Sequence, residues 1–196
     1  MSSLSSGDPI AEFQEWFHEA KKTALKDPNA MALATLGADG TPQVRVVLMK
    51  EFDARGLVFF TNTTSSKGQD LLKHPKASVA FFWETTRKQV RVVGNVVPVS
   101  SSEADVYFAS RPRDSQLGAW ASLQSQPMSE RAEFEQRLAQ VTDKYRDLEV
   151  PRPPHWSGYR ILPESIEFWI EKPFRLHDRY IYRKTAEGWQ KTLLYP

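Results

Sequence analysis

The stretch AMALATLGADGTPQVRVVLMK (residues 30–50) decides the fold of this chain. It begins with a short apolar segment (30–36), and the GADG that follows (37–40) supplies glycines where a hairpin turn requires a positive φ. Between residues 42 and 50, alternate side chains face opposite sides of a strand. One face carries Val44, Val46 and Leu48, and the other carries Arg45, Val47 and Met49. The stretch therefore predicts a β-hairpin.

The rest of the chain shows this period of two more often than it shows helical spacing. Further strands are expected over residues 56–61, 77–83, 89–99, 158–162, 165–171, 179–184 and 189–194, with a bulge at Gly94. Helices are expected from Asp8 to about Asp27 and over residues 65–74, 101–110, 116–121 and 129–146. Because short turns join the strands and no strand–helix alternation repeats, the pattern predicts an α+β fold, an antiparallel sheet or barrel with helices packed outside.

The composition narrows the possible functions. The 196 residues suit a single domain over 8–196, after a flexible Ser/Gly-rich N-terminus (1–7). The absence of cysteine excludes disulfides, thiolate metal sites and cysteine nucleophiles, and four widely spaced histidines predict no metal centre. A net charge of +2 without a basic stripe disfavours nucleic acid as a partner. No apolar run reaches the ~20 residues of a membrane span and no signal peptide begins the chain, so a cytoplasmic protein without a membrane partner is expected.

The glycine pattern indicates how this chain would bind a phosphate. Among nine glycines there is no G-x-G, and therefore neither a Walker loop nor a dinucleotide fingerprint. Side chains would have to supply the donors. Four clusters offer them: Arg45 with Lys50; Thr61, Ser65, Ser66 and Lys67; Tyr107, Arg111, Arg113 and Ser115; and Arg175, His177 and Arg179, which would share one face of a strand.

Each cluster also has an ordinary structural explanation. Alternating cations on a strand are commonly a solvated face, and TNTTSSKGQ (61–69) suits a simple helix start. RPRDS (111–115) suits a local salt-bridge corner, and RLHDR (175–179) suits a strand with cross-strand ion pairs. The clusters taken singly leave these alternatives open.

Taken together and in order, several segments resemble a known family. They are RVVLMK (45–50), FFTNTTSSKG (59–68), KQVRVVG (88–94), YFASRPRDSQLGAWAS (107–122), QS (124–125), IEFW (166–169) and RLHDR (175–179). They are similar to the FMN-dependent pyridoxine/pyridoxamine 5′-phosphate oxidases, from about Asp8 to the C-terminus. The resemblance implies an antiparallel split β-barrel with flanking helices, and a homodimer with two FMN sites at its interface.

The resemblance also implies roles for individual residues. The FMN contacts it implies, some of them from the partner chain, are Arg45, Val46, Val47, Leu48, Met49, Lys50, Phe60, Thr61, Lys67, Gln89, Gln124, Ser125, Trp169 and Arg179. The implied substrate-phosphate contacts are Lys50, Tyr107, Arg111 and Ser115. Arg175 and His177 would hold the substrate's pyridine ring against the flavin and are the implied catalytic residues.

The implied reaction oxidises pyridoxamine or pyridoxine 5′-phosphate to pyridoxal 5′-phosphate, with O2 as acceptor and H2O2 as product. One alternative is a related FMN oxidase acting on another aromatic substrate, such as a phenazine precursor. A non-enzymatic flavin carrier or nucleic-acid-binding barrel is an alternative of a different class.

Three departures from the family pattern accompany the resemblance. Ser66 stands where the family often has arginine, and the chain ends Leu193-Leu194-Tyr195-Pro196 where many members have Arg-Leu-x-Pro. The chain also begins too close to its first helix to carry the Arg-x-x-Tyr arm that covers the substrate in many members. A weaker phosphate contact and a more open pocket are therefore expected.

Overall fold

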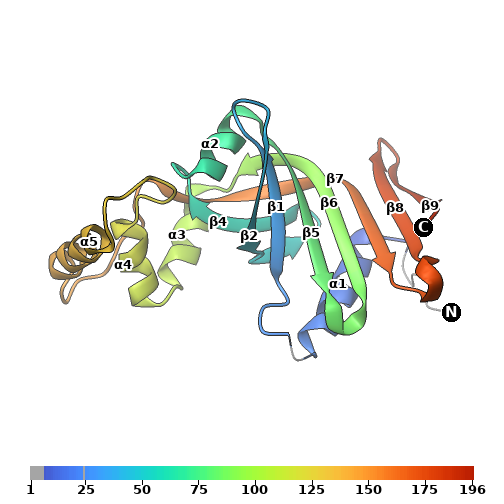
Figure 1. Ribbon diagram of the computed structural model, residues 1–196, viewed down its shortest axis with the longest axis horizontal. Coiled ribbons are helices and arrows are strands. Elements are labelled where there is room, and N and C mark those ends of the chain that lie inside the picture. Colours follow the sequence, from blue (N-terminus) through green and yellow to red (C-terminus); the bar gives the residue numbers. More distant parts are fainter. Residues whose placement is uncertain (1–6, 24) are drawn as a thin grey trace.

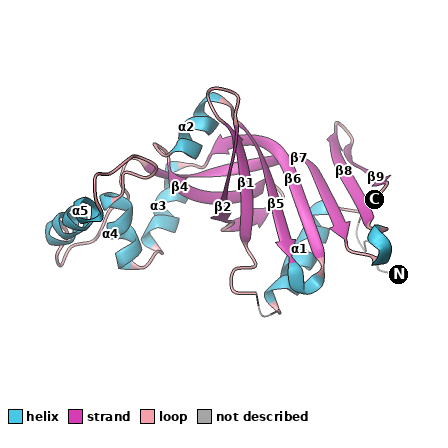
Figure 2. Ribbon diagram, in the orientation of Figure 1, coloured by secondary structure: helices cyan, strands magenta, loops and turns pink. Residues whose placement is uncertain are grey.

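The computed structural model describes residues 7–23 and 25–196, so most of the expected flexible N-terminus lies outside the described residues. Over these ranges an antiparallel sheet carries the fold and five α-helices lie around it (Figures 1 and 2). The strands are β1 (Ala30–Leu36), β2 (Pro42–Leu48), β3 (Glu51–Asp53), β4 (Gly56–Asn62), β5 (Lys76–Trp83), β6 (Lys88–Pro98), β7 (Trp156–Ile170), β8 (Asp178–Thr185) and β9 (Gly188–Leu194). The helices are α1 (Pro9–Lys21), α2 (Ser66–Lys73), α3 (Ser101–Ala109), α4 (Arg113–Ala121) and α5 (Arg131–Lys144). The α+β prediction is confirmed.

The long strand β7 is where the sheet divides. One edge of β7 pairs with β6, from Pro98 opposite Tyr159 to Lys88 opposite Ile170. Its other edge pairs first with β4, over 156–161, and then with β8, over 165–170. The sheet therefore forks into a β4–β3 branch and a β8–β9 branch, which diverge in Figure 1, and this fork makes the curled barrel a split one.

Strand β7 corrects one prediction and confirms another. The two strands expected over 158–162 and 165–171 are one continuous strand. The register with β6 shifts between Val93 and Gly94, opposite Pro163, as the predicted bulge requires. A Cβ on Gly94 would lie 2.0 Å from the carbonyl oxygen of Leu162, so only glycine fits there.

Helix α1 closes one end of the core inside the curled sheet. The ring of Phe13 lies 4.1 Å from that of Phe52 and 5.2 Å from that of Phe81, between centroids. Trp83 is buried beside them and donates its indole N–H to the carbonyl of Pro28. The helix ends at Lys21, earlier than expected, because both the hydroxyl and the backbone N–H of Thr23 bind the carbonyl of Ala20.

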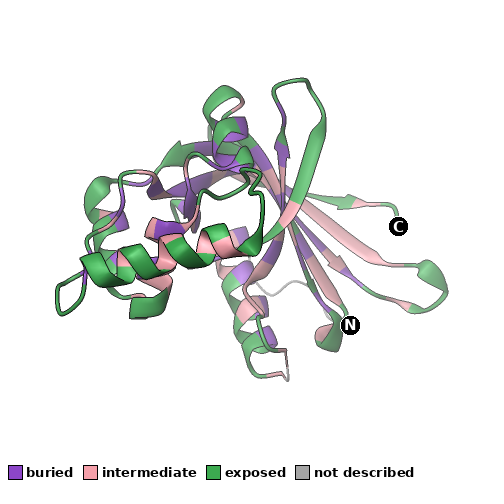
Figure 3. Ribbon diagram, turned by 60° about the vertical axis from the view of Figure 1, so that its left-hand side comes forward, coloured by how far each residue is buried: buried purple, intermediate pink, exposed green. Residues whose placement is uncertain are grey.

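Helices α3, α4 and α5 form a second lobe with a small core of its own. Its buried residues are Phe108, Leu117, Tyr145, Val150 and Trp156. Helix α5 packs a half-buried stripe of residues against this core, and the rest of the helix is exposed. Figure 3 shows the same mixture of half-buried and exposed residues on the helices that lie outside the sheet. Arg113, the first residue of α4, donates to the carbonyls of Tyr145 and Leu148 and so ties α4 to the end of α5.

Two further expectations concern the chain as a whole. None of the described helices combines the length and the apolar character that crossing a membrane requires. The single domain over 8–196 and the cytoplasmic location stay predictions.

Candidate active site

A cleft of about 790 Å³ lies where β2 and β4 meet α2, α3 and α4. It collects most of the residues singled out by the sequence. From the expected flavin set it is lined by Arg45, Val46, Val47, Leu48, Lys50, Phe60, Thr61, Lys67 and Gln124. From the expected substrate-phosphate set it is lined by Lys50, Tyr107, Arg111 and Ser115. Segments as distant in the chain as Arg45 and Gln124 thus meet in one cavity.

Lys67 is a buried cation at one end of the cleft. Its Nζ lies 3.3 Å from the Thr61 hydroxyl, 3.3 Å from the Ser65 hydroxyl and 3.0 Å from Oε1 of Gln124. Ser65 is the N-cap of α2, so the first turn of the helix and its dipole face the same place. Burial, and then the charge of Arg45, lower the pKa of Lys67 below its ordinary value. An anion beside Nζ would offset that cost.

Gly68 lets α2 approach the preceding loop. A Cβ at this position would lie 2.2 Å from the backbone oxygen of Thr63, closer than any side chain tolerates. Glycine is therefore required for α2 to begin where it does, with Lys67 turned into the cleft.

Arg45 reaches the same end of the cleft from β2. Its guanidinium hydrogen-bonds the hydroxyl of Thr35 and lies 3.5 Å from the carboxylate of Asp70, to which Thr35 donates at 2.6 Å. Arg45 and Lys67 together carry two positive charges, and Asp70 neutralises only one of them. That surplus makes this end of the cleft attractive to a phosphate. Ser66 is exposed and supplies no cation.

Arg111 is a further cation that lines the cleft. Its guanidinium packs 4.8 Å from the ring of Trp156 and 5.6 Å from that of Phe108, and its Nη1 is buried without a hydrogen-bond partner among the described residues. Burial lowers the pKa of Arg111. Because a buried donor without an acceptor is costly, an oxyanion beside Nη1 would suit this position.

An aromatic wall stands beside Arg111. The ring of Phe60 stacks 4.0 Å from that of Tyr107 and 5.4 Å from that of Trp156. Lys50 lies 5.9 Å from the Tyr107 ring centroid. The cleft thus offers a flat apolar surface between two cationic ends, which suits a planar phosphorylated ring.

Three expected flavin residues lie in a row outside the cleft. Gln89 on β6 pairs with Trp169 on β7, which pairs with Arg179 on β8. All three are half-buried on the outer face of the sheet, the face that also bears Val46 and Phe82. These three residues are a part of the expected flavin set that lies apart from the cleft.

Arg175 and His177 correct the prediction that 175, 177 and 179 share a strand face. Arg175 ends a 3₁₀ turn (Pro173–Arg175), and only Arg179 lies in a strand. Arg175 and Phe174 have φ values of 62° and 59°, a left-handed backbone that interrupts any strand. The loop lines its own cavity of about 560 Å³ together with Trp169, whose ring lies 4.5 Å from that of His177.

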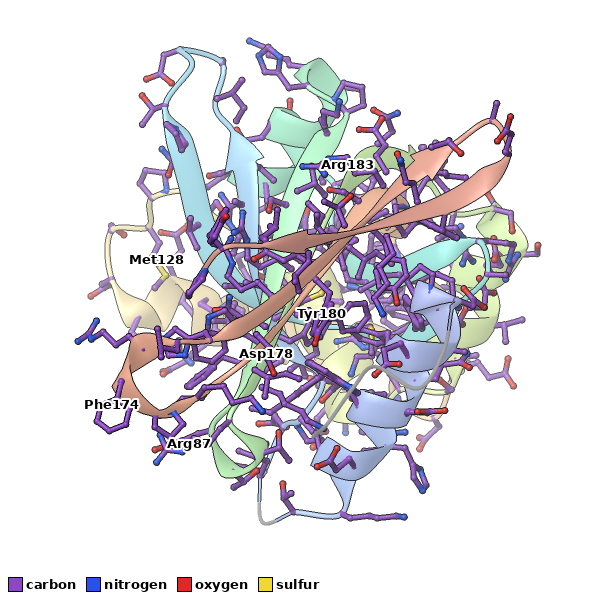
Figure 4. The ribbon with its side chains drawn as sticks, turned by 90° about the vertical axis from the view of Figure 1, so that its right-hand side faces the viewer. Arg87, Met128, Phe174, Asp178, Tyr180 and Arg183 are labelled. Carbon is purple, nitrogen blue, oxygen red and sulfur yellow. The ribbon has the colours of Figure 1, made fainter. Side chains whose placement is uncertain are left out.

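The loop lies far from the cleft of its own chain. In Figure 1 the 3₁₀ turn before β8 and the helix α4 occupy opposite ends of the molecule. Figure 4 shows Phe174 at the outer edge of the molecule, pointing away from the sheet, and it is 93% exposed. A single chain therefore does not bring Arg175 and His177 to Arg111.

Two further expected flavin residues lie outside the cleft. Met49 directly follows β2, and its side chain is buried in the core and lines a different cavity, beside Phe17 and Phe52. Ser125 is exposed in the loop after α4, with φ at 72°.

Sequence reasoning missed several residues that shape the cleft. Asn62, Ser110, Ser122 and Trp156 line it, and Thr35 and Asp70 hold Arg45. Asn62 carried a usable signal, because its side chain accepts from Thr64 as an Asx turn does. The others depend on contacts between distant segments and had no local signal.

Comparison with known proteins agrees with this geometry. Residues 17–145 match the family described as pyridoxamine 5′-phosphate oxidase, and residues 156–196 match the pyridoxine 5′-phosphate oxidase C-terminal dimerisation region. The chain belongs to the pyridoxamine 5′-phosphate oxidase family. Membership implies a flavin cofactor and suggests a homodimer.

Relatives of this family match the chain over nearly its full length. A pyridoxine/pyridoxamine 5′-phosphate oxidase of Caulobacter vibrioides is 55% identical over 98% of this chain and 87% of its own length. That of Rhodospirillum rubrum is 54% identical over the whole of both chains. Among solved structures, PhzG from Burkholderia lata 383, in complex with tetrahydrophenazine-1-carboxylic acid, superposes with a TM-score of 0.92 at 32% identity, covering 98% of this chain and 94% of that one.

A more distant structure supports the fold alone. A pyridoxamine 5′-phosphate oxidase-related, FMN-binding protein of Nostoc punctiforme superposes with a TM-score of 0.76 at 17% identity, covering 97% of this chain and 100% of that one. The split-barrel fold expected from the family resemblance is thereby confirmed.

Proposed function

We propose that this chain is an FMN-dependent oxidase that converts pyridoxamine or pyridoxine 5′-phosphate to pyridoxal 5′-phosphate, reducing O2 to H2O2. One observation carries the proposal: Arg111, whose Nη1 is buried without a hydrogen-bond partner among the described residues, shares a cleft with a separate cation pair, Arg45 and Lys67. Two anion sites in one cleft suit two phosphorylated molecules, a cofactor and a substrate. The names of relatives at 54–55% identity support this choice of substrate.

The residues at the Arg45–Lys67 end fit the phosphate of FMN. The hydroxyls of Thr61 and Ser65 accept from Lys67 and orient its ammonium group, and the phosphate would carry a charge of about −1.5 to −2. The backbone of β2 from Val46 to Lys50 would run along the flavin, beside Phe60, Gln124 and Ser125. FMN, when bound, supplies the two-electron acceptor for the oxidation and passes the electrons to O2.

A homodimer would complete the site. The outer face of β2, β1 and β5 exposes Val46 by 69% and Phe82 by 55%, beside the row of Gln89, Trp169 and Arg179. A twofold interface places the same face on both protomers. We propose that it carries this row, and the loop with Arg175 and His177, onto the partner's cleft. Each dimer would then hold two composite sites.

The substrate would be held at both ends. Lys50, Tyr107, Arg111 and Ser115 would bind its phosphate, while Arg175 and His177 face its pyridine ring. The Nδ1 of His177 accepts from the backbone N–H of Lys172 at 3.2 Å, so in the neutral imidazole Nε2 carries the proton and is free to donate. These contacts hold the reacting carbon at the flavin, which makes catalysis chiefly a matter of positioning.

The likeness to PhzG supports a second candidate, an FMN oxidase acting on a reduced phenazine precursor. The Arg111 site favours the phosphorylated substrate instead, because a non-phosphorylated ring would leave the buried Nη1 without an acceptor.

The test is an aerobic assay with added FMN that follows aldehyde and H2O2. It compares pyridoxamine 5′-phosphate, pyridoxine 5′-phosphate and pyridoxamine. Turnover of the phosphorylated forms alone is expected, whereas a protein that takes up no flavin, or that does not distinguish pyridoxamine from its phosphate, would contradict the proposal.

A further inference from the structure

We propose that Glu167 is a positioning residue that fixes Arg179 toward the ring end of the flavin; the inference rests on the proposed function. Glu167 lies on β7, between β6 and β8, and its side chain is only 9% exposed. Its Oε1 accepts from Nε and Nη2 of Arg179 at 2.9 and 2.8 Å. One carboxylate oxygen therefore accepts two charge-assisted hydrogen bonds from the same guanidinium, which fixes its orientation.

Two further contacts surround this pair. Arg91, directly opposite Glu167 on β6, donates from Nη1 at 3.2 Å to Oε2, the carboxylate oxygen that does not contact Arg179. The Nη1 of Arg179 also donates to the backbone carbonyl of Tyr195 at 3.1 Å. Glu167 thus stands between two guanidinium groups, with one arginine fixed by three contacts.

The fixed guanidinium still has donors to offer. Arginine has five N–H groups, and Glu167 and Tyr195 take up three of those on Arg179. The remaining two are available to an acceptor outside the chain. Arg179 pairs with Trp169, and Trp169 with Gln89, so these donors belong to a row with an indole face and an amide. A flat heterocycle with carbonyl acceptors, such as the isoalloxazine ring, suits such a row.

Glu167 orients the Arg179 side chain before the flavin binds. A long arginine side chain that is free in solution loses rotamer freedom when it binds, and that loss lowers affinity. Since Glu167 already holds Arg179 in the flavin-free protein, most of this rotamer freedom is lost before the flavin binds. The effect concerns the ring end only, because the phosphate end is held by Arg45 and Lys67 in the cleft.

The test separates the two ends of the flavin by using two ligands. FMN and riboflavin are titrated into the full-length protein freed of flavin, and binding is followed by quenching of flavin fluorescence.

Glu167→Gln keeps the size of the side chain and removes its charge. Glu164→Gln is the matched control, because Glu164 lies on the same strand but binds Lys76 and Asn95 at the surface. Lys67→Met perturbs the phosphate end, and Arg91→Gln perturbs the cluster while leaving the Glu167–Arg179 contacts in place.

The expected pattern is specific. Glu167→Gln raises the Kd of FMN and of riboflavin by the same factor, about tenfold, the size expected for losing one charge-assisted contact. Lys67→Met raises the Kd of FMN alone, while Glu164→Gln and Arg91→Gln stay close to the wild-type values. The melting temperature of the flavin-free protein, measured for every variant, shows whether any of them is simply misfolded.

Three results would overturn the inference. One is a Glu167→Gln protein that binds both ligands as the wild type does. Another is a loss confined to FMN, which would place the effect at the phosphate end. The third is an equal loss in Arg91→Gln, which would make the cluster a purely structural one. A wild-type protein that binds neither ligand would overturn the proposed function as well, so the two failures are distinguishable.

Discussion

Lys67 Nζ lies 3.0 Å from Oε1 of Gln124, a residue 57 positions later in the chain. This contact joins the start of α2 to the loop between α4 and α5, inside the cleft. The Thr61 hydroxyl donates to the same oxygen at 3.0 Å, so three segments converge on the place where the cofactor phosphate is proposed to bind.

The charge of Lys67 predicts how flavin affinity depends on pH. Burial and Arg45 place the pKa of Lys67 below its ordinary value of 10.5. Below that lowered pKa the ammonium attracts the phosphate; above it the neutral amine does not, so the Kd of FMN rises as pH increases through the alkaline range. Titration of FMN between pH 7 and 9.5 measures this. In Lys67→Met the Kd is higher and nearly constant with pH, and riboflavin, which lacks the phosphate, shows no such trend. A pH-independent Kd for FMN in the wild type would contradict the prediction.

The two arginines of the 111–115 segment are expected to differ in role. Arg111→Met removes the guanidinium whose Nη1 has no partner among the described residues, so kcat/KM for pyridoxamine 5′-phosphate falls by about 10- to 100-fold through KM, as the loss of a charge-assisted contact predicts. The same change relieves a buried unpaired charge and raises the stability of the ligand-free protein by about 1 kcal/mol.

Arg113→Met is the control for that variant, because Arg113 binds the carbonyls of Tyr145 and Leu148. It lowers the melting temperature and leaves KM nearly unchanged. Kinetics and thermal melting of both variants check the pair, and equal effects on KM would argue against an anion site at Arg111.

Two glycines provide a prediction about α2. Gly68→Ala forces a Cβ to within 2.2 Å of the Thr63 oxygen, so α2 must shift, at a cost of about 1–3 kcal/mol in stability and with weaker FMN binding. At Gly118, in α4, no atom lies within 4 Å of the added Cβ, and alanine there adds about 0.5–1 kcal/mol. Thermal melting distinguishes them, and a Gly68→Ala protein as stable as the wild type would refute the steric explanation.

The exposed outer face of the sheet is expected to form the dimer interface. Phe82→Asp places a charge on that face and shifts the protein to a folded monomer that has lost flavin affinity. Leu72→Asp, on α2 and 76% exposed, introduces the same charge away from that face and leaves the dimer intact. Analytical ultracentrifugation over a range of concentrations measures the shift. If both variants stay dimeric, the interface lies elsewhere.

Local patterns were sufficient to predict most of the fold. The alternation in β2, the helix over 101–110 and the glycine bulge in β6 are each set by neighbouring residues, and all three appear in the structure. The length of β7 could not be predicted in this way, because Pro163 suggests a break where the chain in fact continues opposite Gly94.

The site was harder to predict than the fold. The residues of the cleft were named from motifs, but the partners that give them their properties lie on other elements. Asp70 holds Arg45, and Glu167 holds Arg179, through contacts that no local pattern marks. The period of two also misled at Arg175, because two consecutive left-handed residues replace the expected strand.

A complementation experiment tests the composite site most directly. Arg111→Met damages the cleft, and the double variant Arg175→Ala/His177→Ala damages the loop; each homodimer should be nearly inactive. If each site combines one protomer's cleft with the partner's loop, a mixed dimer has one intact site. Random exchange of equal amounts should then restore about a quarter of the wild-type activity, since half of the dimers are mixed and each has one working site of two. Oxidation of pyridoxamine 5′-phosphate that stays at the level of the separate variants, although mass spectrometry shows mixed dimers, would contradict a site shared between protomers.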